Sequence, residues 1–283
     1  MNIISTIAQL RSAVSNAKAE GKVVGLVPTM GALHQGHLSL VERAKAECDF
    51  VVVSIFVNPT QFNNPNDLKT YPRTIDADCE KLVASGVDVA FIPTVEEVYS
   101  GPDTRTFNLG PVADVMEGAM RPGHFNGVAQ IVSKLFDYVL PDKAYFGEKD
   151  YQQIAVIRRM VEIEGYNLEI VPCPIMREKD GLAMSSRNVR LSVQQRAVAP
   201  AIHKILAENA ELSKTTHDIS VLRTDVINKI NAIDGMELEY YEIVDSLTMQ
   251  PVETWDGTKS LVGCVTVWMG DVRLIDNIKY PAK

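Results

Sequence analysis

The chain contains 283 residues, of which 46% are hydrophobic, and its mean hydropathy is near zero. This composition supports an ordinary globular core in one large or two medium domains, and it argues against disorder. The 28 basic and 36 acidic residues give a formal net charge of −8 without a basic run, which argues against general binding to nucleic acid or to an anionic membrane.

Cysteine usage and the first residues bear on the cellular compartment. The four cysteines lie far apart and form no CxxC pair, which indicates a reduced protein. The N-terminus lacks the basic and then apolar segments of a secretory leader. No apolar stretch approaches the roughly 20 residues of a membrane span. We therefore expect a cytoplasmic protein without membrane association.

Helix and strand patterns alternate along the first part of the chain. An amphipathic helix is expected from Thr6 to about Gly21, and the run VVGLV after it is typical of a strand buried on both faces of a sheet. The elements predicted next, in chain order, are a helix at 37–48, a strand at 50–57, a helix near 75–86, a strand at 87–93, a helix at 127–140, a strand at 144–147, a helix at 151–165 and a strand at 168–175. This alternation predicts an α/β fold with a Rossmann-like, doubly wound, mostly parallel sheet that binds ligands at the carboxyl ends of its strands.

The alternation stops after about residue 176. A polar segment leads into a long helical stretch, a second helix at 219–233 and β-rich runs such as 237–245 and 261–269. We therefore expect a first domain over residues 1–176 and a smaller α+β domain with an antiparallel sheet over residues 177–283.

The segment MGALHQGH, residues 30–37, joins a predicted strand to a predicted helix, where backbone N–H groups favour phosphate. It matches neither GxxxxGK[ST] nor GxGxxG. His34 and His37 can instead donate hydrogen bonds to phosphate oxygens or, as cations, stabilise charge that builds during a displacement. Two alternatives stay open: His37 caps or packs against the helix, or HxxH belongs to a metal site, for which no third ligand lies nearby in sequence.

VNPTQF, residues 57–62, ends the next strand with the amides of Asn58 and Gln61. Amides can donate to and accept from hydroxyl or carboxylate groups of a ligand. Taken alone, however, an ordinary Asn-Pro turn explains this segment better.

YFGEKDYQQ, residues 145–153, forms another junction between a strand and a helix. Lys149 could neutralise a phosphate, Asp150 could bind ribose hydroxyls, and Gln153 could face the same cleft. A solvated helix start with Asp150 as N-cap explains the segment equally well.

Two polar segments remain. DGLAMSSRN, residues 180–188, offers two hydroxyls and Arg187 to a triphosphate, or it is a capped linker. RPGHFNG, residues 121–127, offers Arg121 or His124 to the cleft, but a structural turn is at least as good an explanation.

Together the segments PTMGALHQGHLSL, VNPTQF, RPGHFNGV, YFGEKDYQQ and DGLAMSSRN resemble the pantothenate synthetase (pantoate–β-alanine ligase) family in order and spacing. HxGH is also similar to the HIGH signature of the wider nucleotidyltransferase superfamily, and MSSRN takes the place of its KMSKS loop. HxGH alone identifies only the superfamily, whereas five ordered motifs over residues 28–188 identify the family. The C-terminal third carries little motif information.

The resemblance implies an AMP-forming carbon–nitrogen ligase that condenses (R)-pantoate with β-alanine to pantothenate, for coenzyme A biosynthesis. ATP, as substrate, would give a pantoyl-adenylate and diphosphate, and β-alanine would then release AMP, with Mg²⁺ on the phosphates. Adenylation supplies the leaving group that a carboxylate lacks, and holding adenylate and amine together replaces a bimolecular encounter. The resemblance further implies small-molecule substrates, no nucleic acid or membrane partner, and a homodimer.

The resemblance also implies residue roles. His37 would be the catalytic proton donor, with His34 and Lys149 beside it in catalysis. The residues that would bind ATP are Met30, Gly31, Ala32, Leu33, His34, Gln35, Gly36, His37, Gly147, Glu148, Lys149, Asp150, Met176, Met184, Ser185, Ser186 and Arg187. Pantoate would contact Gln61, Gln153, Asn58, Pro28 and Met30, and Gln61 would also meet β-alanine. The C-terminal domain would form a lid over the active site.

The sequence departs from the family pattern at two places. Gln35 stands where members often carry Glu, in a variable position of the motif. The segment IDADC is less acidic than in some relatives, so the protein ligands of Mg²⁺ stay open, with Asp78 a weak candidate. Magnesium usually retains water and phosphate ligands in any case.

Three other functions compete with the ligase. A nucleotidyltransferase that stops at a nucleotidylated product would not need β-alanine for AMP release. A synthetase that charges tRNA is disfavoured by the acidic balance. A non-catalytic nucleotide-binding regulator has no support in the sequence, because His34, His37, Lys149 and Arg187 are all present.

Overall fold

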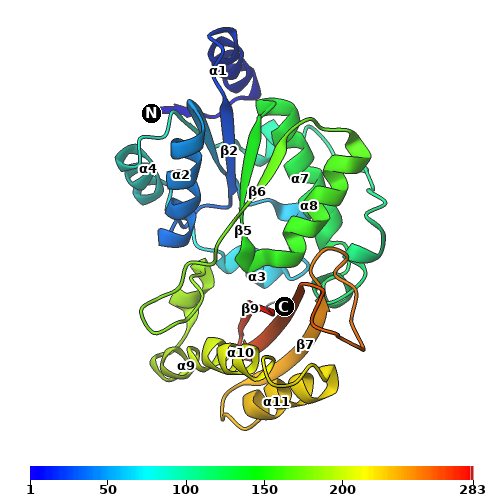
Figure 1. The fold of residues 1–283 in the computed structure, drawn as a ribbon. Helices are drawn as coiled ribbons and strands as arrows, with labels where there is room; N and C mark the ends of the chain where they lie inside the picture. Colours follow the sequence, from blue (N-terminus) through cyan, green and yellow to red (C-terminus); the bar gives the residue numbers. More distant parts are fainter. Residues whose placement is uncertain (281, 283) are drawn as a thin grey trace. The chain divides into compact units, whose positions relative to one another are not determined.

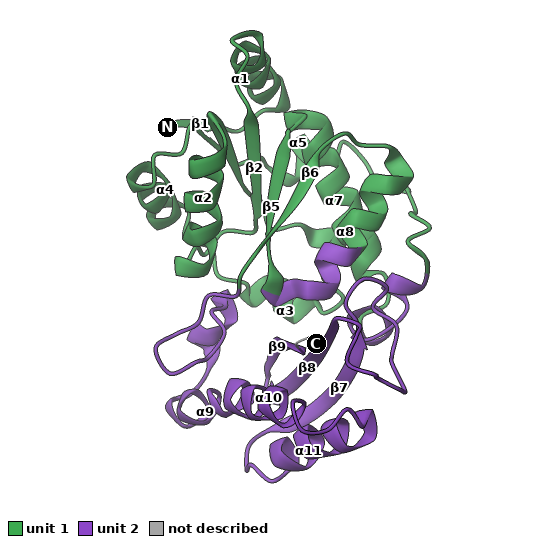
Figure 2. Ribbon diagram, in the orientation of Figure 1, with its two compact units in different colours: residues 1–110, 121–148, 156–174 green, residues 111–120, 149–155, 175–283 purple. Residues whose placement is uncertain are grey.

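The structure, a computed structural model, describes residues 1–280 and residue 282 (Figure 1). Its contacts divide the chain into two compact units, coloured separately in Figure 2. Unit 1 comprises residues 1–110, 121–148 and 156–174. Unit 2 comprises residues 111–120, 149–155 and 175–283, so two short segments that precede residue 156 belong with the C-terminal part.

Unit 1 is built on a six-stranded sheet in the order β1-β4-β3-β2-β5-β6, and every pair of neighbours is parallel. The strands are β1 (Asn2–Ile4), β2 (Val24–Thr29), β3 (Phe50–Ile55), β4 (Val89–Phe91), β5 (Lys143–Gly147) and β6 (Glu169–Cys173). Val, Ile, Leu and Ala dominate the inner strands, as expected for strands covered on both faces. The prediction of an α/β fold with a doubly wound parallel sheet is confirmed.

The chain order of the strands reverses between β2 and β5. From β2 the chain proceeds outward through β3 and β4, whereas β5 pairs with the other side of β2 and leads to β6. Ligands of open parallel sheets bind outside the carboxyl ends of the strands at such a switch point. The turn after β2 and the residues after β5 therefore occupy the expected place for a binding site.

Helices cover both faces of this sheet (Figure 1). α2 packs on β2, β3 and β5, while α1 and α7 pack on each other and on β2. The helices that lie within unit 1 are α1 (Ile7–Ala19), α2 (Gln35–Glu47), η1 (Pro59–Gln61), α3 (Pro65–Thr70), α4 (Ile75–Ala84), α5 (Val95–Val98) and α7 (His124–Val139). η2 (Gly110–Ala113), η3 (Glu148–Asp150) and α8 (Tyr151–Glu164) cross from one unit to the other along the chain.

Unit 2 contains an antiparallel sheet in the order β7-β8-β9, as expected for an α+β domain. Its elements are α6 (Glu117–Met120), η4 (Ser186–Arg190), α9 (Val193–Val198), α10 (Ala201–Leu212), α11 (Ile219–Asn231), β7 (Glu237–Asp245), β8 (Leu261–Met269) and β9 (Val272–Tyr280). The long helical stretch expected after residue 190 is two helices, because Pro200 lies between α9 and α10 and cannot continue the backbone hydrogen bonds of a helix.

All four cysteines are unpaired. Burial raises the pKa of the Cys173 thiol to about 11 and that of Cys264 to about 12, so both stay protonated at neutral pH and act as small apolar groups. In the part of the chain that the structure describes, no helix has the length and apolar character needed to cross a bilayer.

Candidate active site

The turn that follows β2 has an unusual backbone. Gly31 and Ala32 both adopt left-handed conformations, with φ of 79° and 50°. A Cβ atom on residue 31 would lie 3.0 Å from Ile55 Cγ2, so glycine fits both the dihedral angle and the space. The turn directs the N–H groups of Ala32 and Leu33 to one point, the carboxylate of Asp78.

Asp78 is completely buried and holds this turn from α4. Its two oxygens accept from the N–H groups of Ala32 and Leu33, each at 2.8 Å, and from the Thr74 hydroxyl at 3.1 Å and 3.2 Å. Lys81 lies 3.9 Å from the carboxylate and donates to the Leu33 carbonyl at 2.7 Å. The side chain weighed from sequence as a magnesium ligand therefore has its oxygens occupied by donors of the turn.

His34 and His37 form a reciprocal cap at the start of α2. His34 Nδ1 accepts from the N–H of Gly36 at 3.1 Å, and His37 Nδ1 accepts from the N–H of His34 at 3.3 Å. The ring centroids lie 4.0 Å apart. In this arrangement Nδ1 of each ring accepts a hydrogen bond, and Nε2 is the second ring nitrogen that can donate one.

One interpretation that the sequence left open is seen in this geometry: His37 caps the helix, and it does so through Nδ1. A cap made through Nδ1 is compatible with phosphate binding, because the ring has a second nitrogen, Nε2, that can donate a hydrogen bond.

Asn58 and Gln61 lie next to each other after β3. Asn58 is 1% exposed, and its Nδ2 donates to the Gly127 carbonyl at 3.1 Å and to Gln61 Oε1 at 3.2 Å. Because a backbone carbonyl only accepts, the NH₂ of Asn58 must face Gly127. The Gln61 amide therefore turns its oxygen toward Asn58 and its NH₂ toward Met30 Sδ, 3.1 Å away.

α7 fixes the backbone of Gln61 as well. The Gln61 carbonyl lies 2.8 Å from His124 Nδ1 and accepts from Arg121 at 3.4 Å. Gly127 allows this close approach, because a Cβ there would lie 2.5 Å from the Thr60 carbonyl oxygen. Arg121 and His124, considered from sequence as possible ligand contacts, thus support Gln61 in this structure.

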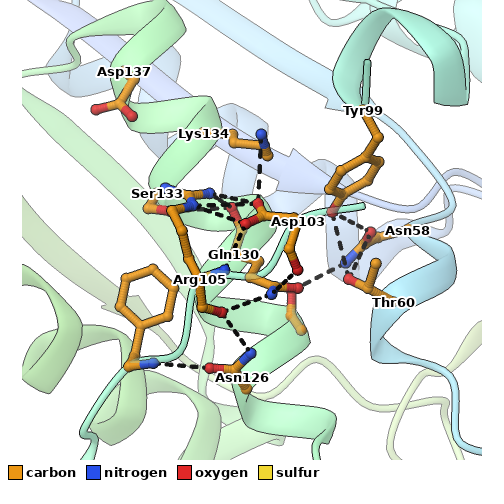
Figure 3. A network of polar contacts seen from close by, with 12 residues as sticks. Asn58, Thr60, Tyr99, Asp103, Arg105, Asn126, Gln130, Ser133, Lys134 and Asp137 are labelled. Carbon is orange, nitrogen blue, oxygen red and sulfur yellow. Dashed lines mark hydrogen bonds and ion pairs between the residues drawn. The ribbon is translucent and has the colours of Figure 1, made fainter. Parts of the chain in front are cut away.

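A polar network that the sequence analysis missed extends from Asn58 (Figure 3). Asn58 Oδ1 accepts from the Tyr99 hydroxyl at 2.7 Å, and Lys134 lies over the Tyr99 ring. Lys134 also lies 3.5 Å from Asp103, which pairs with Arg105 at 2.8 Å. The hydrogen bond from Arg105 lowers the pKa of Asp103 to about 2.

Gln130 and Asn126 of α7 complete the network by binding the backbone around Arg105. The network thereby fastens the loop before residue 110 to α7, beside the residues that orient Gln61. No motif signalled it, because Tyr99 lies 41 residues from Asn58 along the chain and the residues that follow it in the network lie further away.

After β5 the chain forms η3, whose residues Lys149 and Asp150 belong to unit 2, and then enters α8. Lys149 Nζ lies 3.8 Å from Asp150, and the Lys149 carbonyl accepts from Asn277 Nδ2 at 3.0 Å. Gln153 is partly buried. Its neighbour Gln152 is 5% exposed and donates to the carbonyls of residues 112 and 115, so this glutamine is structural.

The polar segment after β6 begins with a short hairpin. Met184 N–H donates to the Met176 carbonyl at 2.9 Å, and the Met176 side chain is exposed. Ser185 caps η4, its hydroxyl accepting from the N–H of Arg187 at 3.2 Å. Among the described residues, no group of three or more His, Cys, Asp or Glu side chains is arranged to hold a metal ion, so the HxxH metal site considered from sequence finds no third ligand.

The comparison with protein families is decisive. A family model described as pantoate-beta-alanine ligase matches residues 2–279. The chain belongs to the pantoate–β-alanine ligase family. Pantothenate synthetases of Porphyromonas gingivalis and Bacteroides fragilis are 57% and 58% identical to it over 280 residues, and each alignment covers 99% of both proteins.

Solved structures of pantoate–β-alanine ligases share the fold. The pantothenate synthetase of Thermus thermophilus matches with a TM-score of 0.93 and 43% identity, covering 99% of this chain and 100% of its own. The pantoate–β-alanine ligase of Francisella tularensis, complexed with β-γ ATP and β-alanine, matches with a TM-score of 0.80 and 36% identity, covering 98% and 97%. The protein is thus an ATP-dependent ligase of pantoate and β-alanine.

The residues that the sequence assigned to the substrates of this pantoate–β-alanine ligase fall in both units. Unit 1 contains Pro28, the turn 30–37, Asn58, Gln61, Gly147 and Glu148. Unit 2 contains Lys149, Asp150, Gln153, Met176 and the segment 184–187. The structure places Met30 and Gln61 in direct contact, and it places Lys149 beside Asp150.

Proposed function

We propose that the ligation proceeds through a pantoyl-adenylate and that the turn at residues 30–37 binds ATP while it forms. The observation that supports this most is the reciprocal histidine cap, in which Nδ1 of each ring accepts from the backbone and Nε2 is the nitrogen that would donate to a phosphate. Preorganised N–H donors stabilise the negative charge that develops on a phosphate during displacement. In this proposal His37 is the proton donor to the departing diphosphate, and His34 binds the phosphates beside it.

We assign pantoate to Gln61, with Asn58, Pro28 and Met30 in support and Gln153 as a second amide. The Asn58 amide turns the Gln61 NH₂ outward to Met30, which suits the hydroxyl and carboxylate oxygens of pantoate, since these accept hydrogen bonds. Pro28 and Met30 offer apolar contacts for its methyl groups. Gln61 would also meet β-alanine.

The remaining ATP contacts belong to unit 2 and to the end of β5. Lys149 would neutralise phosphate charge and Asp150 would bind ribose, while Met176 would contact adenine. The segment 184–187 would close over the phosphates. Residues 177–283 would then act as a lid, which protects the adenylate from water. Protection of this segment from proteases on addition of ATP and pantoate would test the lid.

Mg²⁺ is proposed to enter with ATP. Phosphate oxygens and water supply most ligands of this ion in nucleotide sites, and the Asp78 oxygens already accept from the turn. We therefore assign no protein ligand to it. When bound, the ion would reduce the negative charge on the phosphates.

We also propose a homodimer in the cytoplasm. The unpaired cysteines agree with a reducing compartment, and the dimer follows from the family resemblance. Sedimentation of the purified protein, with a mass near one or two times 31.2 kDa, decides the oligomeric state.

Replacing Gln61 by Ala is expected to raise the KM for pantoate about tenfold or more, because a positioned amide donor is lost. The KM for ATP should change much less. Steady-state kinetics with each substrate varied separately measures this, and an unchanged pantoate KM would rule out the assignment of Gln61.

The two-step reaction itself is tested by following diphosphate and AMP separately. With ATP, Mg²⁺ and pantoate, diphosphate exchange should require pantoate, and AMP release should additionally require β-alanine. AMP release without β-alanine would favour a different reaction sequence. Nucleotide products that do not depend on pantoate would leave only a nucleotidyltransferase of unknown acceptor.

A further inference from the structure

Two neighbouring residues of β9, Asp276 and Asn277, bind both segments of unit 2 that we assign to ATP. Their side chains are 5% and 4% exposed. Neither belongs to a motif that pointed to function. Asp276 binds the hairpin that leads to Ser185–Arg187, and Asn277 binds the backbone of Lys149.

The hairpin is fixed to β9 through Arg177. This guanidinium donates to both carboxylate oxygens of Asp276, at 2.7 Å and 3.0 Å, and to the Gly181 carbonyl at 3.2 Å. An antiparallel backbone bridge joins Arg177 to Ala183. At the tip, Gly181 has φ of 95° and lies close to His203, since a Cβ there would be 3.0 Å from the His203 ring. The Gly181 carbonyl is bound by the same Arg177, so this arginine joins the tip of the hairpin to Asp276.

The hairpin continues into the proposed phosphate loop. Asn188 Nδ2 donates to the Ala183 carbonyl at 3.0 Å, which ties the end of the loop back to the hairpin. Ser185 and Arg187 lie between these anchors, so the position of their backbone depends on the contact between Arg177 and Asp276.

The other segment is fixed through Asn277. Its Nδ2 donates to the Lys149 carbonyl at 3.0 Å. Its N–H donates at 2.8 Å to Asp276 Oδ1, the same oxygen that accepts from Arg177 at 3.0 Å. Asp276 Oδ1 thus accepts both from Arg177, which binds the hairpin, and from the N–H of Asn277, whose side chain binds Lys149.

Stability alone does not account for this arrangement. A buried ion pair costs much of its Coulomb energy in desolvation, and apolar residues of similar size would often stabilise a fold as well. A two-point contact between guanidinium and carboxylate instead fixes direction and distance. Two segments that bind the same triphosphate need a fixed distance and orientation relative to each other.

We propose that Asp276 and Asn277 are positioning residues that hold Lys149 and the Ser185–Arg187 loop in a fixed register for the phosphates of ATP. The proposal rests on the proposed ATP contacts of Lys149 and this loop. It implies that these two segments keep their mutual spacing and act as one phosphate-binding surface of unit 2.

The first test compares two buried asparagines of unit 2. Asn277 donates to the carbonyl of Lys149, and Asn209 of α10 donates to the carbonyl of Leu222 at 2.9 Å, far in sequence from any assigned site. Asn277→Ala should raise the ATP KM in the diphosphate-forming half-reaction about tenfold, the effect of one lost hydrogen bond. The β-alanine KM should stay within about twofold of wild type. Asn209→Ala should lower thermal stability and leave the ATP KM unchanged.

The second test asks whether Asn277 acts through Lys149. In a Lys149→Ala background, the effect of Asn277→Ala on the ATP KM should shrink from about tenfold to about twofold, because coupled residues are not additive. Asp276→Asn, which keeps the shape and removes the charge, should raise the ATP KM by on the order of tenfold through the loop.

The outcomes distinguish a failure of the positioning role from a failure of the ATP assignment. If Lys149→Ala raises the ATP KM and Asn277→Ala does not, the positioning role is wrong while the ATP contact stands. Equal effects of the Asn277 and Asn209 variants would also overturn it, since general destabilisation would then explain both. If Lys149→Ala leaves the ATP KM unchanged, the ATP assignment fails and the positioning role fails with it.

Discussion

His37→Ala is expected to slow adenylate formation by a factor on the order of 10² or more, the usual loss when one preorganised donor to a developing negative charge is removed. The variant should still bind pantoate, because we assign that substrate to Gln61 and Asn58, which follow β3. The rate is measured by single-turnover formation of diphosphate from ATP and pantoate.

The structure allows the two functions of this ring to be separated. Nδ1 of His37 accepts from the backbone and caps α2, whereas Nε2 is the proposed donor. Asparagine can place an oxygen near the position of Nδ1, and the longer glutamine can place an NH₂ near that of Nε2. His37→Asn should therefore keep the thermal stability and lose the rate, and His37→Gln should keep more of the rate. Near-normal turnover of His37→Asn would exclude the donor role.

The place of the candidate site residues in the fold could be predicted, because the signals for it are local. The run VVGLV before MGALHQGH shows a buried strand that ends in a turn, and a parallel sheet brings such turns to one edge. The same logic placed Asn58 and Gln61 after a strand. Their role as ligand contacts did not follow from position alone, since a turn explained that segment better, and it came from the family resemblance.

The supporting contacts could not be predicted, because their partners are far apart in sequence. Gly127 looks like one helical residue among others until the Thr60 carbonyl is found within 2.5 Å of its missing Cβ. Asp276 lies 99 residues from Arg177. A sequence pattern records which face of an element is apolar, but it does not record which buried polar group a distant side chain will meet.

Asp78 illustrates the same limit. From the sequence it belongs to an acidic helix start, which is equally typical of a cap, a solvated surface or a metal ligand. Only the fold brings it under the turn of residues 30–37, where its two oxygens receive two backbone N–H groups.

Asp78→Ala should be the most damaging substitution for the turn at residues 30–37, which we propose binds ATP. It would leave the buried N–H groups of Ala32 and Leu33 without their acceptor, and each such loss costs about 1–3 kcal/mol. We therefore expect the free energy of unfolding to fall by about 2–6 kcal/mol, a large part of the total for an ordinary domain. Urea unfolding of the purified variant measures this loss.

The substitution should also raise the ATP KM, because Gly31 and Ala32 occupy left-handed conformations that the contacts to Asp78 help to maintain. Asp76 supplies a matched control: it lies in the same first turn of α4 and carries the same charge, but it is exposed. Asp76→Ala should leave both stability and the ATP KM close to wild type. Asp78→Asn, which keeps one acceptor oxygen, should fall between the two.

The pattern across these variants distinguishes an anchor from a metal ligand. An anchor predicts that Asp78→Ala loses stability without any metal present and that excess Mg²⁺ does not restore the ATP KM. A metal ligand predicts normal unfolding without metal and a KM that recovers as Mg²⁺ is raised. Because both oxygens already accept from the turn, we expect the first pattern, and the second would reassign Asp78 to the ion.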